Sequence, residues 1–315
     1  MSSSTSRPNY SQDARGLVYG VGFTIMQLSA ICSIYIIVRI VSRWVRLGKR
    51  PITLRFPFYI AITDLMLYVS LMTDQLHDVI FSRNWDEPMC KITATAVSIS
   101  GFSNMMLVCS VTFITFSTIV LGKHIDLGAG DWKLLSTVAI FAILMGFVTI
   151  PSAGSSWYWC YEEMFANNKT IQILVILVEV TLFLLTFFFA VKVWIVLMNA
   201  QNAVRELESG STNRESISVF DKYTVSTTAK PQRNYKRERL LEVAARKIMT
   251  FVLNYFIQWS GTTPYILMSV FDIYQDWMIV LCTIGMNCGG ILNMIGFIRN
   301  EGWVDHEDST KMVSF

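Results

Sequence analysis

Five polar side chains lie in apolar stretches of this sequence, where each needs a partner. They are Asp64, Ser103, Asn104, Asn287 and Asn293. A buried carboxylate or amide is costly unless it is hydrogen-bonded, and inside a membrane it is a functional hypothesis by default. If their segments lie side by side, Asp64 can accept hydrogen bonds from the amides. Such a network either clasps the segments together or coordinates a cation through water, and the sequence leaves both open.

A second polar group could bind a small molecule. It comprises Asp74, Glu179, Gln258, Trp259 and Tyr265. Carboxylates and aromatic rings that line a shared cavity favour a cationic or hydroxyl-bearing ligand. Aromatic residues also gather at membrane interfaces without any ligand, which is the alternative reading for the tryptophan and the tyrosine.

Seven apolar segments hold these residues, and each is long enough to cross a bilayer. The chain is 53% hydrophobic and 16% charged, with a mean hydropathy of +0.44, which favours a membrane protein over a soluble domain. Backbone groups in lipid have no water partner, so each segment is expected to be a helix of an all-α bundle. The expected helices are 17–40, 56–76, 90–121, 134–151, 171–198, 248–271 and 277–298. The third is the longest and has no charge after Lys91, so we expect it to be the central helix.

The basic residues predict how this bundle is threaded. With the N-terminus outside and the C-terminus inside, 21 of the 26 Lys and Arg residues fall in inner connections. Both glycosylation sequons, at Asn9 and Asn168, then lie outside. So do Cys90 and Cys160, which could form a disulfide in an oxidising compartment, two free thiols being the alternative. The expectation is a multi-pass protein of the plasma membrane.

Three segments outside the bundle are expected to be more polar. They are a short outer tail (1–16), a third inner loop (199–245) and a short inner tail (299–315). The Ser- and Thr-rich first part of the loop predicts disorder and suits regulatory kinases. Its second part, KRERLLEVAARKIMTF, reads as an inward extension of the sixth helix, and Pro264 predicts a kink in that helix.

These features resemble the G protein-coupled receptors over about 17–299. IAITDLMLYV, which contains Asp64, is similar to the receptors' second helix, and Asn104 lies where a polar partner often occurs. GILNMIGFIRN and YFIQWSGTTPY resemble the last and sixth helices of the fungal and slime-mould cAMP-receptor-like (class E) group. The central helix ends TFITFSTIVLGKH without Asp-Arg-Tyr, and the last helix lacks Asn-Pro-x-x-Tyr, which disfavours the rhodopsin-like class proper.

The resemblance implies an extracellular ligand of unknown identity and coupling to a heterotrimeric G protein, with lipid around the bundle. It implies no cofactor, no metal apart from a cation near Asp64, and no nucleic acid. A Gα helix is expected to bind in an inner cleft bordered by Lys123, His124, Arg246 and Lys247, opened by movement of the sixth helix.

Three other functions fit the sequence less well than a receptor does. A retinal-binding rhodopsin needs a lysine in the last helix, and 277–298 has none. An intramembrane hydrolase needs paired catalytic groups, but Asp64 and Glu179 lie at different depths on separate helices, so no enzyme is expected. A small-solute transporter remains the alternative, and Gly285, Gly289 and Gly290 are its only glycine cluster.

Overall fold

The computed structural model describes residues 12–48, 52–81, 85–123, 125–155, 160–162, 169–212, 229–269, 271 and 275–301. Three expected site residues, Asn9, His124 and Asn168, lie outside the described residues. So do the middle of the third loop (213–228) and most of the C-terminal tail (302–315).

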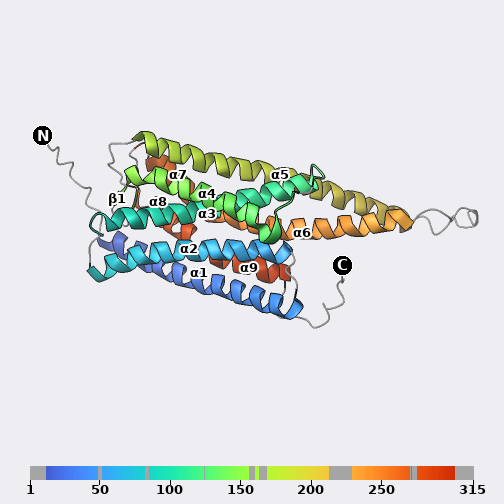
Figure 1. Ribbon diagram of the computed structural model, residues 1–315, viewed down its shortest axis with the longest axis horizontal. Helices are drawn as coiled ribbons and strands as arrows, with labels where there is room; N and C mark the ends of the chain where they lie inside the picture. The colour runs from blue at the N-terminus through green and yellow to red at the C-terminus, as the bar shows by residue number, and fades with distance from the viewer. Residues whose placement is uncertain are drawn as a thin grey trace, which may run out of the picture.

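The described chain is a bundle of long helices (Figure 1). The helices are α1 (Gln12–Leu47), α2 (Ile52–Phe81), α3 (Met89–Ile119), α4 (Trp132–Thr149), α5 (Lys169–Thr212), α6 (Ala229–Ser260), α7 (Thr262–Ser269), α8 (Asp276–Asn287) and α9 (Gly289–Glu301). Only Gly261 separates α6 from α7, and only Cys288 separates α8 from α9. Counting each of these pairs once gives seven helices, which confirms the expected all-α seven-helix bundle.

Two short 3-10 turns and a small hairpin complete the described part. The turns are η1 (Ala129–Asp131) and η2 (Ile150–Ser152), and the hairpin pairs β1 (Ala153–Ser155) with β2 (Cys160–Glu162) in antiparallel register.

Most of the bundle is apolar enough to cross a membrane. Within the described ranges, α1 to α5 each contain a span of sufficient length and hydropathy. The pair α8 and α9, bent by 44°, makes a sixth. The sequence predicts one helix over 248–271, but α6 ends at Ser260 and α7 begins at Thr262. Pro264 explains this break, because its ring clashes with the carbonyl four residues earlier, which is that of Ser260.

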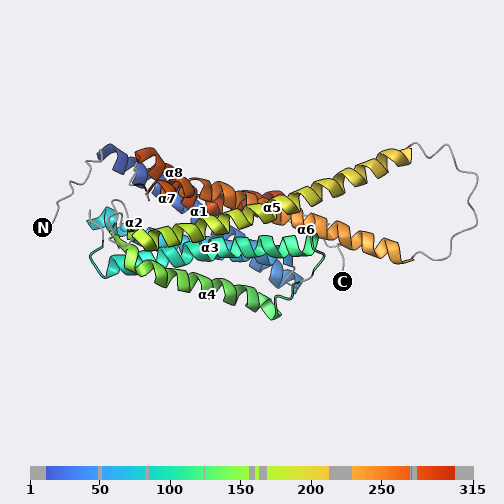
Figure 2. The same ribbon diagram turned by 90° about the horizontal axis from the view of Figure 1, so that it is seen from above.

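The central position expected for the third helix is confirmed. In α3, 72% of the most apolar window is buried inside the protein, compared with 33–44% in the other four continuous spans. It packs against α2, α4, α5 and α6, and both views place it among the other helices (Figures 1 and 2). The residues that α3 carries are therefore placed where several helices can share them.

The third-loop region is more helical than the sequence suggests. The expected loop is 199–245, yet α5 continues to Thr212 and α6 begins at Ala229. Both helices run well beyond the rest of the bundle (Figure 2). The residues that follow the apolar part of α5, such as NAQNAVRELES, are mostly good helix formers, so the helix has no local reason to stop where the apolar run ends.

Candidate functional site

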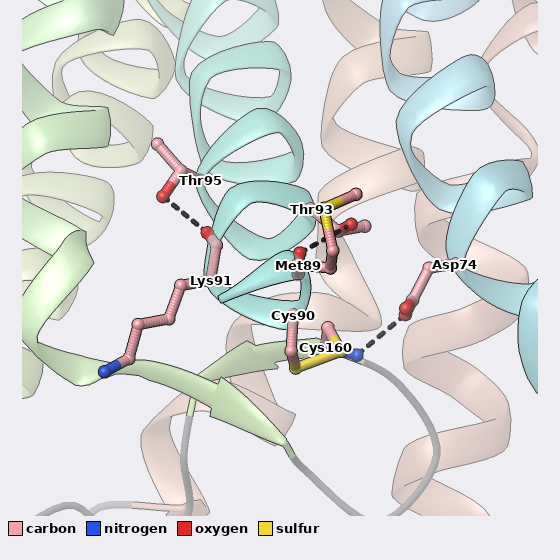
Figure 3. Close-up of a disulfide and its surroundings, with 7 residues drawn as sticks. All are labelled: Asp74, Met89, Cys90, Lys91, Thr93, Thr95 and Cys160. Atoms are coloured by element: carbon pink, nitrogen blue, oxygen red, sulfur yellow. Dashed lines mark hydrogen bonds between the residues drawn. A yellow bond between two sulfur atoms is a disulfide. The ribbon is translucent and has the colours of Figure 1, made fainter. Parts of the chain in front are cut away.

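One end of the bundle, which we name the disulfide end, is closed by the bond between Cys90 and Cys160 (Figure 3). Cys90 is the second residue of α3, and Cys160 begins β2, so the bond ties the hairpin across the central helix. The backbone N–H of Cys160 donates a hydrogen bond to the Asp74 carboxylate on α2, at 2.7 Å. The predicted cysteine pairing is confirmed, and Asp74, which is 3% exposed, positions the hairpin.

A narrow cavity lies just beneath this hairpin, with about 20 Å³ of space open to the centre of a water molecule, which is room for one or two waters. It is bounded by α2, α3, β2, α7 and α8. Its lining residues are Leu71, Gln75, Val97, Cys160, Thr262, Tyr265, Cys282, Thr283, Met286 and Asn287. We call it the upper cavity, and Tyr265 is the one member of the expected ligand group that lines it.

The upper cavity differs in character from the acidic cavity that the sequence suggests. No lining residue that the structure describes carries a charge. Asp74 is directed to the Cys160 backbone, and Glu179 is buried on α5 without lining this space. Asp74 orders the hairpin and does not face the cavity. The position of an acidic residue in the sequence cannot reveal such a role, because the partner is a backbone N–H.

Gln75 is the polar side chain that distinguishes this cavity. It is 2% exposed, and its Oε1 atom has no hydrogen-bond partner among the described residues. A buried acceptor left unpaired costs about 1–3 kcal/mol, so native proteins leave few of them. The carboxamide therefore offers an acceptor to whatever enters the upper cavity.

Three of the five residues of the expected polar network, Asp64, Asn104 and Asn293, come together in the bundle. Asn104 Nδ2 donates to Asp64 Oδ1 at 3.0 Å, and Asn293 Nδ2 donates to Asp64 Oδ2 at 2.7 Å. The indole N–H of Trp259 donates to Asn104 Oδ1 at 3.4 Å. Helices α2, α3 and α9 thus meet at one carboxylate, and α6 joins them through Asn104. Both of its oxygens accept amide hydrogens, as a packing clasp requires.

The remaining members of the two expected groups take separate positions. Asn287 Nδ2 donates to the Thr283 carbonyl within its own helix, and Ser103 is buried on α3. Asn287 and Gln258 both line a second, smaller cavity that also borders Asp64 and has room for about one water molecule. Trp259 therefore belongs with Asp64 and Asn104, while Gln258 lines only the smaller of the two cavities. In the described part of the chain, no three His, Cys, Asp or Glu side chains gather closely enough to hold a metal ion.

The other end of the bundle, which we name the α5–α6 end, carries two ion pairs on a single acid. Glu301, at the end of α9, accepts from Lys247 Nζ of α6 at 2.6 Å and from Arg43 of α1 at 2.7 Å. Its side chain is only 12% exposed. The Asn300 amide also donates to the Lys247 carbonyl, at 3.0 Å. These bonds tie α6 to α9, and α9 to α1.

The connection between α3 and α4, at this same end, is held by acids. Asp131, 1% exposed, accepts from Arg55 at 2.7 Å and from the Tyr59 hydroxyl at 3.1 Å, both on α2. Asp126 is exposed, and the hydrogen bond from Lys133 holds its pKa below the usual value, helped by the Gly128 N–H. The exposed Lys123 lies at the start of this connection.

Sequence reasoning missed Glu301 and Asp131, and it placed Gln75 only among the polar residues that close the second expected helix. Gln75 directly follows Asp74, which drew attention as an acid near the end of an apolar segment. Glu301 has no distinguishing pattern in its surroundings, because its partners are 54 and 258 residues away along the chain. Only the fold brings such pairs together.

Removing the disulfide is expected to destabilise the bundle. The bond closes a loop with a sequence separation of 70 residues, so replacing Cys90 and Cys160 by serine should cost about 2–4 kcal/mol of unfolding free energy. The midpoint of thermal unfolding of the purified protein measures this loss. Cys288→Ser is the matched control, because a serine hydroxyl can keep the bond to the Gly285 carbonyl. An unchanged midpoint in the double variant would show that the hairpin holds its place without the bond.

The arrangement of helices is similar to that of a known membrane protein. The crystal structure of squid rhodopsin matches with a TM-score of 0.67 and 12% sequence identity, covering 92% of this chain and 83% of that chain. No family model matches the sequence, and no curated protein matches it. At this identity the comparison concerns the fold alone: the chain has the seven-helix fold of a rhodopsin.

Proposed function

We propose that this chain is a G protein-coupled receptor that transmits an extracellular ligand signal to a cytosolic heterotrimeric G protein. The supporting observation is the rhodopsin-like fold over 92% of the chain, together with a disulfide that ties a hairpin over the central helix. The bundle also has two distinct ends, with a cavity below the hairpin at one and long helices at the other. A receptor needs such a difference, because it binds a ligand at one end and a G protein at the other.

The proposed orientation places the disulfide end outside the plasma membrane and the α5–α6 end in the cytosol. The distribution of Lys and Arg supports it, as do the two sequons at Asn9 and Asn168. The domain division follows: an outer tail (1–16), the bundle (17–298) with its third inner loop, and an inner tail (299–315). Regulatory kinases would act on the Ser- and Thr-rich part of the third loop.

The proposed ligand enters at the disulfide end and shifts the population of two bundle states. Tyr265 would contact the ligand in the upper cavity. Gln258 lines the smaller cavity, and Trp259 contacts Asn104. Trp259 is joined to the Asp64 network through Asn104, so a ligand that moves the indole also acts on α3. Asp74 and Glu179 would act from beside the cavity.

On the cytosolic side, the proposed response is movement of α6 about the break at Gly261. That movement would open the cleft bordered by Lys123, His124, Arg246 and Lys247 for the C-terminal helix of Gα. The receptor class that we propose is the cAMP-receptor-like class, because the sixth and last helices of this chain resemble that class in sequence.

The transporter alternative has weaker support. A Cβ added at Gly285 would lie 2.6 Å from the Gln258 carbonyl oxygen, and one added at Gly290 would lie 2.3 Å from that of Ser29. Glycines in such contacts permit close helix packing, which any bundle can use.

Nucleotide exchange tests the proposal directly. The full chain, reconstituted in lipid with a panel of Gα proteins, is expected to accelerate GTP exchange on at least one of them when a ligand panel is applied. Solute flux is measured in parallel on the same vesicles. Flux without accelerated exchange would reject the receptor and favour the transporter.

Arg246→Ala is expected to lower ligand-stimulated exchange about tenfold, because an exposed cation at the cleft would lose its contact with Gα. Surface expression should not change. The control is Lys192→Ala, an exposed cation on α5 that borders no part of the proposed cleft. Equal exchange by the Arg246 variant and the wild type would contradict the placement of the cleft.

A further inference from the structure

Two buried polar side chains of the upper cavity each have an atom with no hydrogen-bond partner among the described residues. These atoms are Oε1 of Gln75, on α2, and Oγ1 of Thr262, the first residue of α7. The two residues are 2% and 3% exposed, so bulk solvent does not reach them. A buried polar group is costly without a hydrogen bond, and native proteins keep few of them. Two such atoms around one small cavity indicate a shared partner.

The Thr262 hydroxyl differs from those of its neighbours in the chain. Ser260 donates to the Ile257 carbonyl at 2.7 Å, and Thr263 donates to the Trp259 carbonyl at 2.9 Å. A bond to a carbonyl three or four residues earlier is a common way to satisfy a hydroxyl within a helix. Thr262 makes no such bond to the residues that the structure describes, and its side chain lines the upper cavity.

The upper cavity suits water in both size and chemistry. It has room for one or two waters, and a buried water needs roughly two to four polar partners. Gln75 offers an acceptor, and Thr262 offers a hydroxyl that can donate or accept. The Thr283 hydroxyl also lines the cavity, and because it donates to the Ile279 carbonyl at 2.8 Å, its lone pairs can accept a further bond. Apolar cavities of this size stay dry, but polar groups from α2, α7 and α8 line this one.

We propose that the upper cavity holds ordered water, one molecule or two in contact, that bridges Gln75 Oε1 and the Thr262 hydroxyl. The water donates to the carboxamide oxygen and shares a hydrogen bond with the hydroxyl, so it fastens α2 to the start of α7. This bridge concerns the bundle alone and requires no ligand and no G protein.

The bridge would also restrain the break between α6 and α7. Thr262 directly follows Gly261, about which α6 is proposed to move. A Cβ added at Gly261 would lie 2.4 Å from the Leu281 carbonyl oxygen, so the break is already packed against α8. Water that ties Thr262 to α2 holds the break from a second side. For this consequence the inference rests on the proposed function.

The midpoint of thermal unfolding distinguishes a bridged cavity from a dry one, because the two predict shifts of opposite sign. Gln75→Met and Thr262→Val each remove the polar atom with little change in size. In a dry cavity, removal of an unpaired atom would raise the midpoint; in a bridged cavity, each variant loses hydrogen bonds to water. We expect each variant to lower the midpoint of the purified full chain by about 2–4 °C.

A double variant tests whether the two atoms share the water. Gln75→Met combined with Thr262→Val should lose little more than either substitution alone, because the first already breaks the bridge. Thr181→Val is the matched control, since this hydroxyl on α5 donates to the Leu177 carbonyl of its own helix and lines neither cavity. Its effect should add to that of Gln75→Met. A crystal structure that resolves buried water should show it within hydrogen-bond distance of both atoms in the wild type, and not in the Thr262 variant.

Three results would overturn the bridge: a higher midpoint in either single variant, additive losses in the Gln75 and Thr262 pair, or a wild-type map that shows other buried waters but none here. Ligand-independent GTP exchange tests the restraint on the break. Thr262→Val is expected to raise it about three- to fivefold, and Thr181→Val to leave it unchanged. A lower midpoint with unchanged exchange would overturn the restraint. A wild type that activates no Gα would instead reject the receptor function, and the midpoints would still decide whether the bridge exists.

Discussion

Glu301→Gln is expected to raise ligand-independent GTP exchange about five- to thirtyfold. The substitution removes the ion pairs with both Lys247 and Arg43, at 2.6 and 2.7 Å, while keeping the shape of the side chain. The Lys247 pair ties α6 to α9 at the end where the proposed movement opens the bundle. The Lys247 pair is partly buried and contributes on the order of 1–2 kcal/mol to the closed state, so its loss shifts a two-state population by the corresponding factor. Exchange without added ligand measures the shift.

Two further variants show which of the pairs is responsible. Arg43→Gln breaks only the tie between α1 and α9, so basal exchange should stay near the wild-type value. Asp126→Asn removes a different acid at the same end, whose pair with Lys133 is largely exposed, and it should have no effect. A Glu301 variant with wild-type basal exchange would show that the ties do not restrain α6. An equal rise in the Arg43 variant would place the restraint on α1 instead.

The helices and their order could be predicted from the sequence because hydrophobic length is a local property. Each of the seven expected segments corresponds to a helix or a broken helix in the structure. The residues at which the helices end were harder to predict. Polar residues such as those after Met198 continue a helix as well as apolar ones do, so the end of the apolar run did not mark the end of α5.

Contacts between segments were predictable only where the chemistry left few choices. Asp64 was expected to meet Asn104 and Asn293 because a lone carboxylate in lipid needs donors, and those amides lie at a similar depth. The same reasoning was too coarse for Asp74. Its partner is a backbone N–H of the hairpin, a donor that every residue other than proline carries, so no residue type in the sequence could identify it.

The character of the upper cavity was the hardest feature to infer. Its lining comes from five elements, and which face of each helix points inward depends on tilt and rotation about the helix axis. Glu179 shows the difficulty: it lies in the half of α5 that is nearer the disulfide end and is buried, yet it borders neither of the two described cavities.

Gly290→Ala is expected to lower the midpoint of thermal unfolding by on the order of 10 °C, far more than most single methyl additions. The added Cβ would lie 2.3 Å from the Ser29 carbonyl oxygen and 2.4 Å from Ser33 Oγ. The Gly290 N–H also donates to Ser29 Oγ at 2.8 Å, so α1 and α9 touch through their backbones here. A side chain could rotate away, but a carbonyl within a helix cannot, and the two helices must separate.

The same separation should disturb the polar network, because Asn293 lies one turn after Gly290 and donates to Asp64. Gly20→Ala on α1 is the matched control, since a Cβ there meets nothing within 4 Å, and its midpoint should equal or exceed that of the wild type. Adding Ser33→Ala to Gly290→Ala removes the hydroxyl contact but leaves the carbonyl contact, so it should restore little of the loss. A Gly290 variant as stable as the wild type would mean that α1 and α9 are further apart than the structure places them. The Asp64 carboxylate would then have to hold α2 and α3 together with its donor from α9 displaced.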